Sequence, residues 1–265
     1  MKTKLLSTLL IALLSIVAVS CNLFNSRTEN QLFPVTKNGV YLYLNADGEV
    51  AINPQFSFAS YFNEGLALVQ ELGDSGKKIG FIDYSGKYVI QPDYLTATLF
   101  SEGIAWVAKK NGAPMAIDKN GHVLFKIDEA LVVRSFSQGL APVQVYRNGY
   151  PYWGFVSKTG VFEIQPQFEN VLFFTEDLCA VQKEGVWGFI NKTGRLVIPY
   201  RYSKVGMFNN GRAVYSIDGQ YGLIDKSGKT IINPIYESMD NDGNLYMIKL
   251  DGKMGWCDRN GKTII

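Results

Sequence analysis

Residues of the types that most often catalyse reactions or bind metals are few in this chain. It contains one histidine, His122, and three cysteines, Cys21, Cys179 and Cys257. No group of histidines and cysteines has the spacing of a metal site. His122 follows a glycine that closes a turn motif, at a position where other copies of the motif have lysine, arginine or valine. We therefore expect a solvated strand residue, and the sequence predicts neither catalytic residues nor a metal or other cofactor.

The acidic residues also indicate structural roles. The segment 240–243, Asp-Asn-Asp-Gly, partly matches a calcium loop but lacks the remaining ligands, including the closing glutamate. Glu64 and Glu102 each precede a glycine and recur in step with the repeat described below, so we expect them to accept hydrogen bonds from turn backbone. A hydrolase that uses scattered carboxylates is an alternative, and it requires two acids that converge in one cleft.

The N-terminus has the features of an export signal. Lys2 and Lys4 precede an uncharged stretch, 5–19, which is too short to span a bilayer as a stable helix but suits a signal peptide. Small residues then lead to Cys21, in a pattern that resembles a bacterial lipobox. The sequence thus predicts a lipoprotein signal peptide over 1–20 and lipidation, by palmitate or a similar acyl chain, at Cys21. An ordinary signal peptide cleaved nearby is the alternative.

The polar segment 21–34 is interpreted as the lipidated N-terminus and a tether to the membrane. Asn22 follows the cysteine, which by analogy with other lipoproteins favours the outer membrane of a bacterial envelope; the side of that membrane stays open. Removal of 1–20 takes away two lysines, so the 26 basic residues fall to 24 and balance the 24 acidic ones. A neutral chain argues against nucleic acid as a partner and leaves membrane attachment to the acyl chains.

Most of the remaining chain repeats one motif, an apolar or aromatic residue followed by Gly-x-x-Asp/Asn-x-x-Gly. The closing glycines are spaced by 33 to 39 residues, at Gly48, Gly86, Gly121, Gly160, Gly194, Gly228 and Gly261. The start of the motif is best preserved at Ile79-Gly80, Trp153-Gly154, Trp187-Gly188, Tyr221-Gly222 and Met254-Gly255. So regular a spacing indicates a tandem repeat of one supersecondary unit.

Each motif predicts a hairpin. The Asp or Asn side chain accepts hydrogen bonds from backbone further along, and the closing glycine supplies a positive φ, which together give a type I turn with a glycine bulge. A proline six residues after the glycine, as in Pro92 and Pro166, is expected to end the next strand. An aromatic residue two positions further on is expected in the core. A third strand is predicted after Phe-x-Glu-Gly, as at 100–103.

The predicted fold is therefore all-β. Residues 35–265 are expected to form a tandem array of about six to seven three-stranded antiparallel hairpin or meander repeats, each buried against its neighbours. An open curved or superhelical array is favoured, and a closed propeller-like ring is the alternative.

These motifs resemble the WG-repeat family of bacterial proteins. The Trp-Gly pair is literal at Trp153-Gly154 and Trp187-Gly188, and the resemblance covers about residues 35–265. The copy that contains His122 departs most, because it lacks the proline and the following aromatic residue. The resemblance, with the N-terminal signal, implies a bacterial lipoprotein.

The remaining candidates have two interpretations each. The four tryptophans could form a platform for sugars, but their repeat positions favour the core. Cys179 and Cys257 occupy apolar positions, which predicts free buried thiols. Basic residues after the turn glycines, such as Lys87 and Arg195, could bind an acidic polymer or protect strand edges.

The favoured function is a non-enzymatic, lipid-anchored envelope protein that presents an extended surface to a protein or envelope polymer. A module that binds glycans or cell wall through exposed aromatics is the alternative.

Overall fold

The all-β prediction is confirmed. A computed structural model describes residues 31–73 and 78–264, and it contains 25 strands and no helix within those ranges. The described residues therefore include no helix that could cross a membrane. The predicted signal peptide, Cys21 and most of the predicted tether lie outside the described residues.

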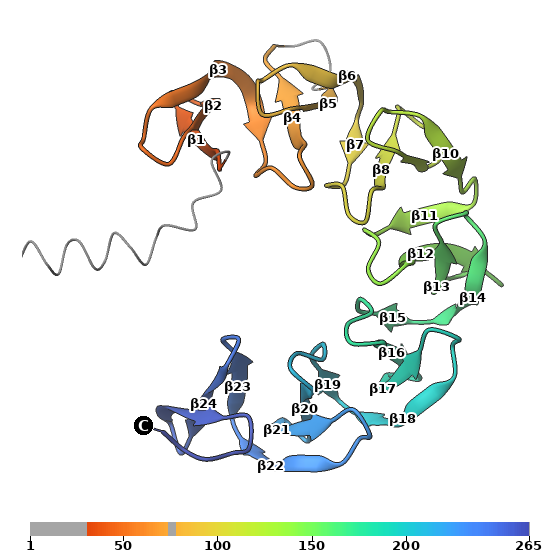
Figure 1. The fold of residues 1–265 in the computed structure, drawn as a ribbon. Coiled ribbons are helices and arrows are strands. Elements are labelled where there is room, and N and C mark those ends of the chain that lie inside the picture. Colours follow the sequence, from red (N-terminus) through yellow and green to blue (C-terminus); the bar gives the residue numbers. More distant parts are fainter. Residues whose placement is uncertain (1–30, 74–77, 265) are drawn as a thin grey trace, which may run out of the picture. The chain divides into compact units, whose positions relative to one another are not determined.

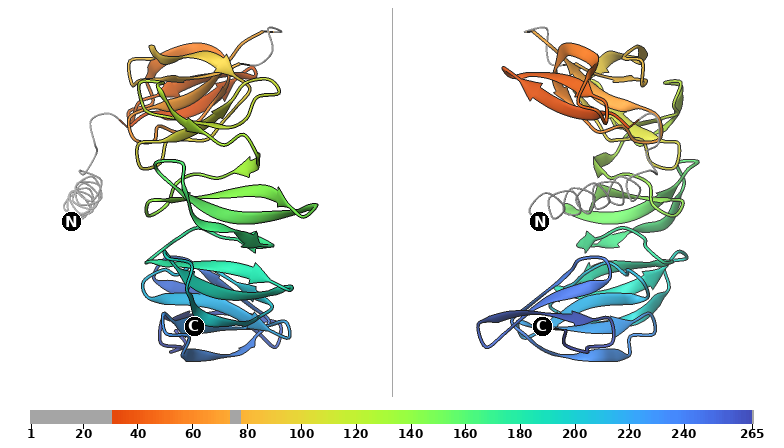
Figure 2. Two further views of the ribbon diagram at one scale, coloured as in Figure 1. Left: turned by 90° about the vertical axis from the view of Figure 1, so that its right-hand side faces the viewer. Right: turned by 60° about the vertical axis from the view of Figure 1, so that its left-hand side comes forward.

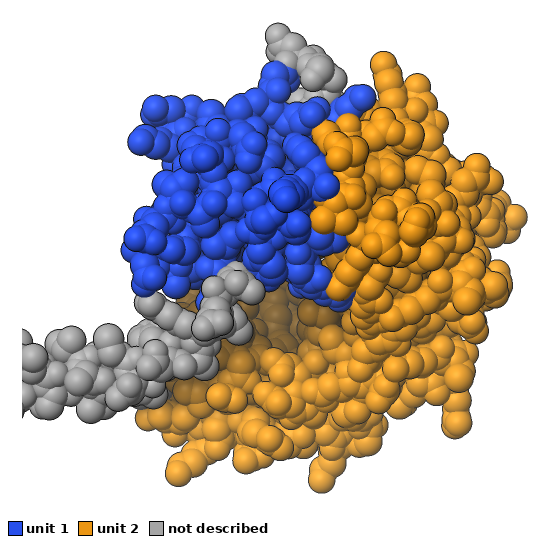
Figure 3. Space-filling view, turned by 45° about the horizontal axis from the view of Figure 1, so that its top comes forward, with its two compact units in different colours: residues 1–88 blue, residues 89–265 orange. Residues whose placement is uncertain are grey.

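The chain forms two compact units, residues 1–88 and 89–265 (Figure 3). In the first unit, five strands pair antiparallel in chain order. They are β1 (Phe33–Lys37), β2 (Val40–Leu44), β3 (Val50–Ala59), β4 (Ala67–Glu71) and β5 (Ile79–Ile82). Strand β6 (Tyr88–Tyr94) begins at the last residue of the first unit and continues into the second.

The second unit contains four four-stranded sheets and a final three-stranded sheet, each formed by strands that follow one another in the chain (Figures 1 and 2). The first two sheets comprise β7 (Thr96–Ala97), β8 (Ala105–Ala108), β9 (Met115–Ile117) and β10 (Val123–Lys126), then β11 (Ala130–Val133), β12 (Leu140–Arg147), β13 (Tyr150–Ser157) and β14 (Phe162–Phe168). The next two comprise β15 (Asn170–Val171), β16 (Leu178–Lys183), β17 (Val186–Asn191) and β18 (Leu196–Tyr202), then β19 (Lys204–Val205), β20 (Arg212–Ile217), β21 (Gln220–Asp225) and β22 (Thr230–Tyr236). The last comprises β23 (Ser238–Asn241), β24 (Leu245–Leu250) and β25 (Lys253–Asp258).

Each four-stranded sheet of the second unit is one repeat with one strand more than the sequence predicted, and the final sheet has three strands. The three predicted strands are present, for example β20, β21 and β22. The additional strand is the short first one, which has two residues in β7, β15 and β19. These short strands lie along one side of the second unit, and the strands after the turn glycines lie along the opposite side (Figure 1).

The predicted turn is confirmed. In the copy that ends at Gly228, the Asp225 Oδ1 accepts hydrogen bonds from the backbone N–H of Ser227 (2.9 Å) and Lys229 (3.0 Å). The Gly228 N–H donates to the Asp225 carbonyl at 2.9 Å. All seven turn glycines predicted from the sequence have φ between +79° and +88°. Asp or Asn at the first position and Gly at the fourth are therefore selected by the backbone of the turn.

The prediction that proline ends the strand is wrong. Pro166 lies inside β14, where the pairing with β13 shifts register opposite Gly154. A Cβ at Gly154 would lie 2.6 Å from the Ile164 carbonyl oxygen and 2.7 Å from the Pro166 nitrogen, so the bulged strand presses directly on this glycine. Because β14 is the last strand of its sheet, the proline removes no hydrogen bond from a further strand. The glycine of the Trp-Gly pair and the distant proline thus belong to one bulge.

The repeats pack through their turns and cores. The closing glycine of each motif rests on the side chain four residues after the closing glycine of the preceding motif. A Cβ at Gly194, for example, would lie 3.3 Å from Ile164 Cγ2. The same contact joins Gly86 to Ile52, Gly121 to Ile90, Gly160 to Phe125, Gly228 to Ile198 and Gly261 to Ile232. One core cluster likewise combines Phe155 of β13 with Ile190 of β17, so these two consecutive sheets are buried against one another.

Candidate functional site

Cys179 and Cys257 are buried as the sequence predicted, and His122 is exposed as predicted but lies just before β10 rather than in a strand. The His122 side chain is 76% exposed, and its Nδ1 lies 3.0 Å from Asp118 Oδ2. Cys179 and Cys257 are free and buried, and burial raises the pKa of both thiols. Among the described residues, no group of three His, Cys, Asp or Glu side chains is arranged to hold a metal ion.

The recurring glutamates join one repeat to the next, as predicted for Glu102. Its Oε2 accepts a hydrogen bond from the Gly139 N–H at 2.9 Å and lies 3.1 Å from Lys158 Nζ. Partial burial opposes ionisation, yet Lys158 and the backbone N–H groups lower the pKa of Glu102 overall. Glu176 makes the equivalent bond to the Gly211 N–H at 3.0 Å. Glu176 does not stand out in the sequence, because an aspartate, rather than a glycine, follows it.

The tryptophans mainly contribute to the core. Trp106 and Trp153 are 1% and 4% exposed, and Trp187 packs at the edge of a core cluster. Trp256 is also partly buried. This arrangement favours the packing interpretation over a tryptophan platform for sugars.

Five residues occupy one equivalent position, which directly follows the first strand in four sheets and lies within β23 in the last sheet. The sheet registers and the backbone hydrogen bonds from Arg134, Leu172 and Gly206 to the next strand define the equivalence. In chain order the five are Thr98, Arg134, Leu172, Gly206 and Asp240. We call the junction between two consecutive sheets a seam and this position the seam position, because its side chain lies where one sheet meets the next.

In the seam between the sheet of β11–β14 and the sheet of β15–β18, an arginine side chain fills the space between the two sheets. The Arg134 guanidinium lies over the indole of Trp153, with 4.1 Å between Cζ and the ring centroid. Its Nη1 donates a hydrogen bond of 2.8 Å to the carbonyl of Val171, in the first strand of the next sheet. In the following seam Leu172 packs against the same core cluster as Trp187. Both seams are closed by the side chain at the seam position.

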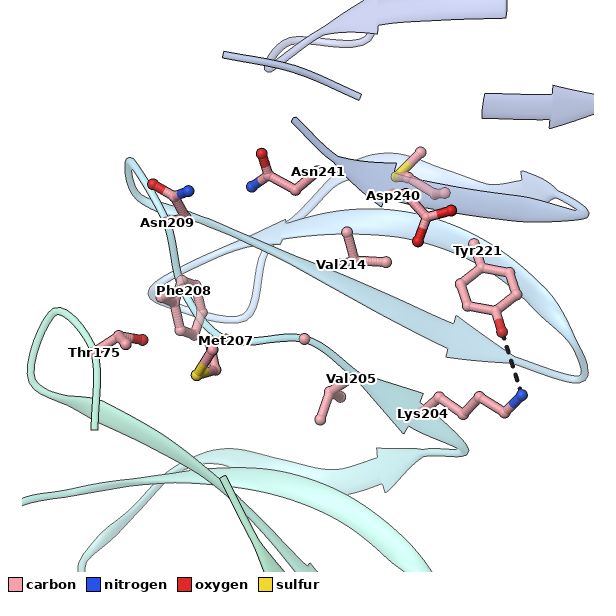
Figure 4. A pocket seen from close by; sticks show the side chains of 12 residues that line it. Thr175, Lys204, Val205, Met207, Phe208, Asn209, Val214, Tyr221, Asp240 and Asn241 are labelled. Carbon is pink, nitrogen blue, oxygen red and sulfur yellow. Dashed lines mark hydrogen bonds between the residues drawn. The ribbon is translucent and has the colours of Figure 1, made fainter. Parts of the chain in front are cut away.

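The next seam is open. Its seam position is Gly206, and a cavity of about 660 Å³ lies between β19, β20 and β23 (Figure 4). The backbone does not require this glycine, because its φ is not positive and a Cβ there would lie 3.8 Å from the nearest atom, Val214 Cβ. The cavity therefore results from a missing side chain rather than from a distorted backbone.

Polar groups of both charges line the cavity. Figure 4 shows Lys204 Nζ approaching the Tyr221 hydroxyl, at 3.4 Å, while Asp240 lies on the neighbouring strand. The structure gives the Asp240 carboxylate no hydrogen bond or ion pair with the described residues. Asn241 and Asn209 add amide groups, and both are exposed.

One buried polar atom at the cavity lacks a partner. The hydroxyls of Ser101 and Ser137 donate to the Phe136 and Phe174 carbonyls of the next repeats, at 2.8 and 2.7 Å. Thr175 occupies the equivalent position in the next repeat, but its buried Oγ1 has no hydrogen-bond partner. A buried hydroxyl without a partner is costly and is normally satisfied by protein, water or ligand. The regular bond is therefore missing between the sheet of β15–β18 and the sheet of β19–β22, at the edge of the cavity.

A second, smaller cavity of about 230 Å³ lies in the seam whose seam position is Thr98. Its lining includes Trp106, Pro114 and residues of β11. It contains no charged side chain, which distinguishes it from the cavity at Gly206.

A sequence comparison identifies the family. The family model described as WG containing repeat matches residues 43–73, 79–112, 153–187, 187–221 and 221–253, which together cover more than half of the chain. This chain belongs to the WG containing repeat family. The segment 113–152, which includes the divergent copy with His122, lies outside these matches, although it contributes β9 and β10 to one four-stranded sheet and β11 and β12 to the next. The cavity at Gly206 lies mainly within the last two matched WG repeats.

Comparison with solved structures finds distant likenesses. BamB from Moraxella catarrhalis is 11% identical, with a TM-score of 0.49, and the alignment covers 88% of this chain and 84% of that chain. Hsv2p from Kluyveromyces lactis is 14% identical, with a TM-score of 0.46 and coverage of 78% and 75%. The WD40 β-propeller domain of Doa1 is 12% identical, with a TM-score of 0.38 and coverage of 85% and 88%. No curated protein sequence matches the chain.

Proposed function

We propose that this WG-repeat protein is a non-enzymatic, lipid-anchored binding scaffold of a bacterial cell envelope. Its repeats present an extended surface to a protein or to an envelope polymer. The proposed location is the outer membrane, to which an acyl chain on Cys21 would anchor the protein.

The observation that carries the scaffold role is the use of the recurring polar side chains within the fold. Glu102 and Glu176 accept hydrogen bonds from turn N–H groups of later repeats, and Ser101 and Ser137 donate to carbonyls there. These side chains hold the repeats in register, so they are not available as pairs of acids for hydrolysis. A rigid row of similar sheets is suited to binding along its length.

The anchor is supported by the N-terminal sequence. Lys2, Lys4 and the uncharged stretch 5–19 form a signal, and Cys21 stands where a lipobox places its acylated residue. The neutral mature chain has no electrostatic attraction to anionic lipid, so the acyl chains would supply the attachment.

The scaffold is tested by fractionation and by capture from membranes. We expect the wild-type protein in the membrane fraction and the Cys21→Ser variant in the soluble fraction. Detergent-solubilised wild-type protein, cross-linked in intact cells before lysis, should retain a defined protein or polymer. Unchanged fractionation of Cys21→Ser would contradict the anchor. A purified protein that turns over envelope glycans or peptides would contradict the non-enzymatic role.

Binding of glycans is the second candidate, and exposed tyrosines are the observation that favours it. Tyr146 and Tyr150, near the tip of the β12–β13 hairpin, are 58% and 68% exposed. Aromatic faces that are open to solvent can stack on sugars. Titration with purified envelope glycan should then quench the protein fluorescence, and the Tyr150→Ala variant should bind more weakly than wild type.

A further inference from the structure

The filled and open seams can be compared residue by residue, because their backbones are equivalent. In the filled seam, Arg134 lies over Trp153 and donates to Val171 of the next sheet. The equivalent residues of the open seam are Gly206, Tyr221 and Met239, and all three line the cavity. The arginine is absent, but an aromatic ring remains where the guanidinium of Arg134 stacks.

The open seam also gains a negative charge. In the sheet that follows the filled seam, the seam position is Leu172. In the sheet that follows the open seam, the seam position is Asp240. Asp240 carries a carboxylate with no hydrogen bond or ion pair among the described residues, and it lines the same cavity as Tyr221 (Figure 4). A guanidinium on an aromatic face is stabilised by cation–π attraction, and a carboxylate adds charge-assisted hydrogen bonds. These two features together suit a guanidinium group.

We infer that the cavity at Gly206 binds an arginine side chain of a partner protein, which inserts where Arg134 lies in the filled seam. The guanidinium stacks on Tyr221 and binds the Asp240 carboxylate. The cavity of about 660 Å³ also accommodates the residues that flank the arginine. This inference rests on the proposed scaffold function and specifies the chemistry of its partner.

Lys204 allows an experiment that distinguishes a positively charged ligand from a negatively charged one. Its Nζ lies 3.4 Å from the Tyr221 hydroxyl, and its charge opposes a bound cation. If the cavity binds arginine, removal of the Lys204 charge tightens binding and removal of the Asp240 charge weakens it. An acidic ligand would reverse both effects, because the same two charges would act with opposite sign.

The experiment is a calorimetric titration of the full-length protein in detergent with an acetylated, amidated Gly-Ala-Arg-Ala-Gly peptide. The matched control peptide has citrulline in place of arginine, which keeps the shape and removes the charge. We expect the citrulline peptide to bind at least about tenfold more weakly. Asp240→Asn should weaken binding of the arginine peptide by about tenfold, and Lys204→Gln should tighten it by about twofold or more.

Two further variants localise the binding. Gly206→Arg should abolish peptide binding, because the protein then fills the cavity itself. Thr98→Arg, at the seam position beside the second cavity, is the matched control and should leave peptide binding unchanged. Circular dichroism verifies that each variant is folded, and Asp240→Asn tests the site without a change in packing volume.

Several results would overturn the inference: equal binding of the citrulline and arginine peptides, tighter binding by Asp240→Asn, or no binding by folded wild-type protein. Tighter binding of a glutamate peptide would assign the cavity to an acidic partner instead. The scaffold function is tested separately by capture from membranes. If wild type and Asp240→Asn retain the same partner there and no arginine peptide binds, the arginine site fails while the scaffold stands.

Discussion

Two seams of the second unit share a backbone arrangement but differ in the side chain that fills the space between the sheets. Between β11 and β15 the seam is closed by Arg134, which stacks on Trp153 and bonds to Val171. Between β19 and β23 the equivalent residue is Gly206, and a cavity takes the place of the side chain. A tandem repeat can thus open a cavity where one side chain is lost, while the hydrogen bonds that define each sheet are retained.

The largest effect on stability should come from substitution of Gly222, with Gly206 as the comparison. Gly222 lies under the bulged strand β22, and a Cβ there would be 2.3 Å from the Ile232 carbonyl oxygen. A Cβ at Gly206 would find its nearest atom at 3.8 Å. Gly222→Ala should therefore lower the free energy of unfolding by at least about 2 kcal/mol, while Gly206→Ala should change it by no more than about 0.5 kcal/mol. Urea denaturation measures both.

Equal effects of these two substitutions would contradict the comparison. They would mean that the backbone at Gly206 requires glycine, as the backbone at Gly222 does. The cavity would then not result from the loss of a side chain.

An intermediate effect should follow from opening the filled seam. Arg134→Ala removes the contact with Trp153 and the hydrogen bond to Val171, so we expect a loss of about 1–2 kcal/mol in the free energy of unfolding. Arg134→Lys is the matched control, because it keeps the charge but loses the planar fork, and it should fall between wild type and Arg134→Ala. A silent Arg134→Ala substitution would show that the arginine does not stabilise the seam.

Most of the fold could be predicted from the sequence, because its signals are local and recur. The Asp225 turn follows from Asp and Gly at fixed positions, and the burial of Phe168 and Tyr236 follows from their place in the motif. The position of Pro166 could not be derived in the same way. Proline is tolerated within a strand at a sheet edge or a bulge, and neither the edge position of β14 nor the bulge over Gly154 is evident from the sequence.

The candidate site could not be predicted, because it depends on a difference between repeats. The short first strands have only two residues in three sheets, too few for a pattern in the sequence. Without these strands, Gly206 is one loop glycine among many and cannot be aligned with Arg134. In the sequence, Asp240 stands out only as part of an incomplete calcium loop. The informative signal was an alignment of 132–134, 170–172 and 204–206, in which the third residue changes from Arg to Leu to Gly.

The smallest effect concerns the bond between Glu102 and the Gly139 N–H, in the seam whose seam position is Thr98, and it depends on pH. Lys158 and turn N–H groups hold the pKa of Glu102 below its ordinary value of 4.5, so the fold favours the ionised carboxylate. Its contribution to stability is complete above 4.5 and is lost as the pH falls through the lower pKa of the folded state. Glu102→Gln should therefore lose less stability than wild type between about pH 7 and pH 3.

Urea midpoints at the two pH values measure this difference. Glu163→Gln is the matched control, because Glu163 is exposed on β14, and it should show the same acid sensitivity as wild type. If Glu102→Gln also matches wild type, the glutamate does not couple the repeats as the structure indicates.

The equivalence of the two seams is tested most directly by a high-resolution structure of the Gly206→Arg variant. We predict that the introduced guanidinium stacks on Tyr221 and fills the cavity, as Arg134 stacks on Trp153, with the backbones of β19 and β23 unchanged. An introduced side chain that points into solvent and leaves the cavity open, or a displaced β23, would contradict the account.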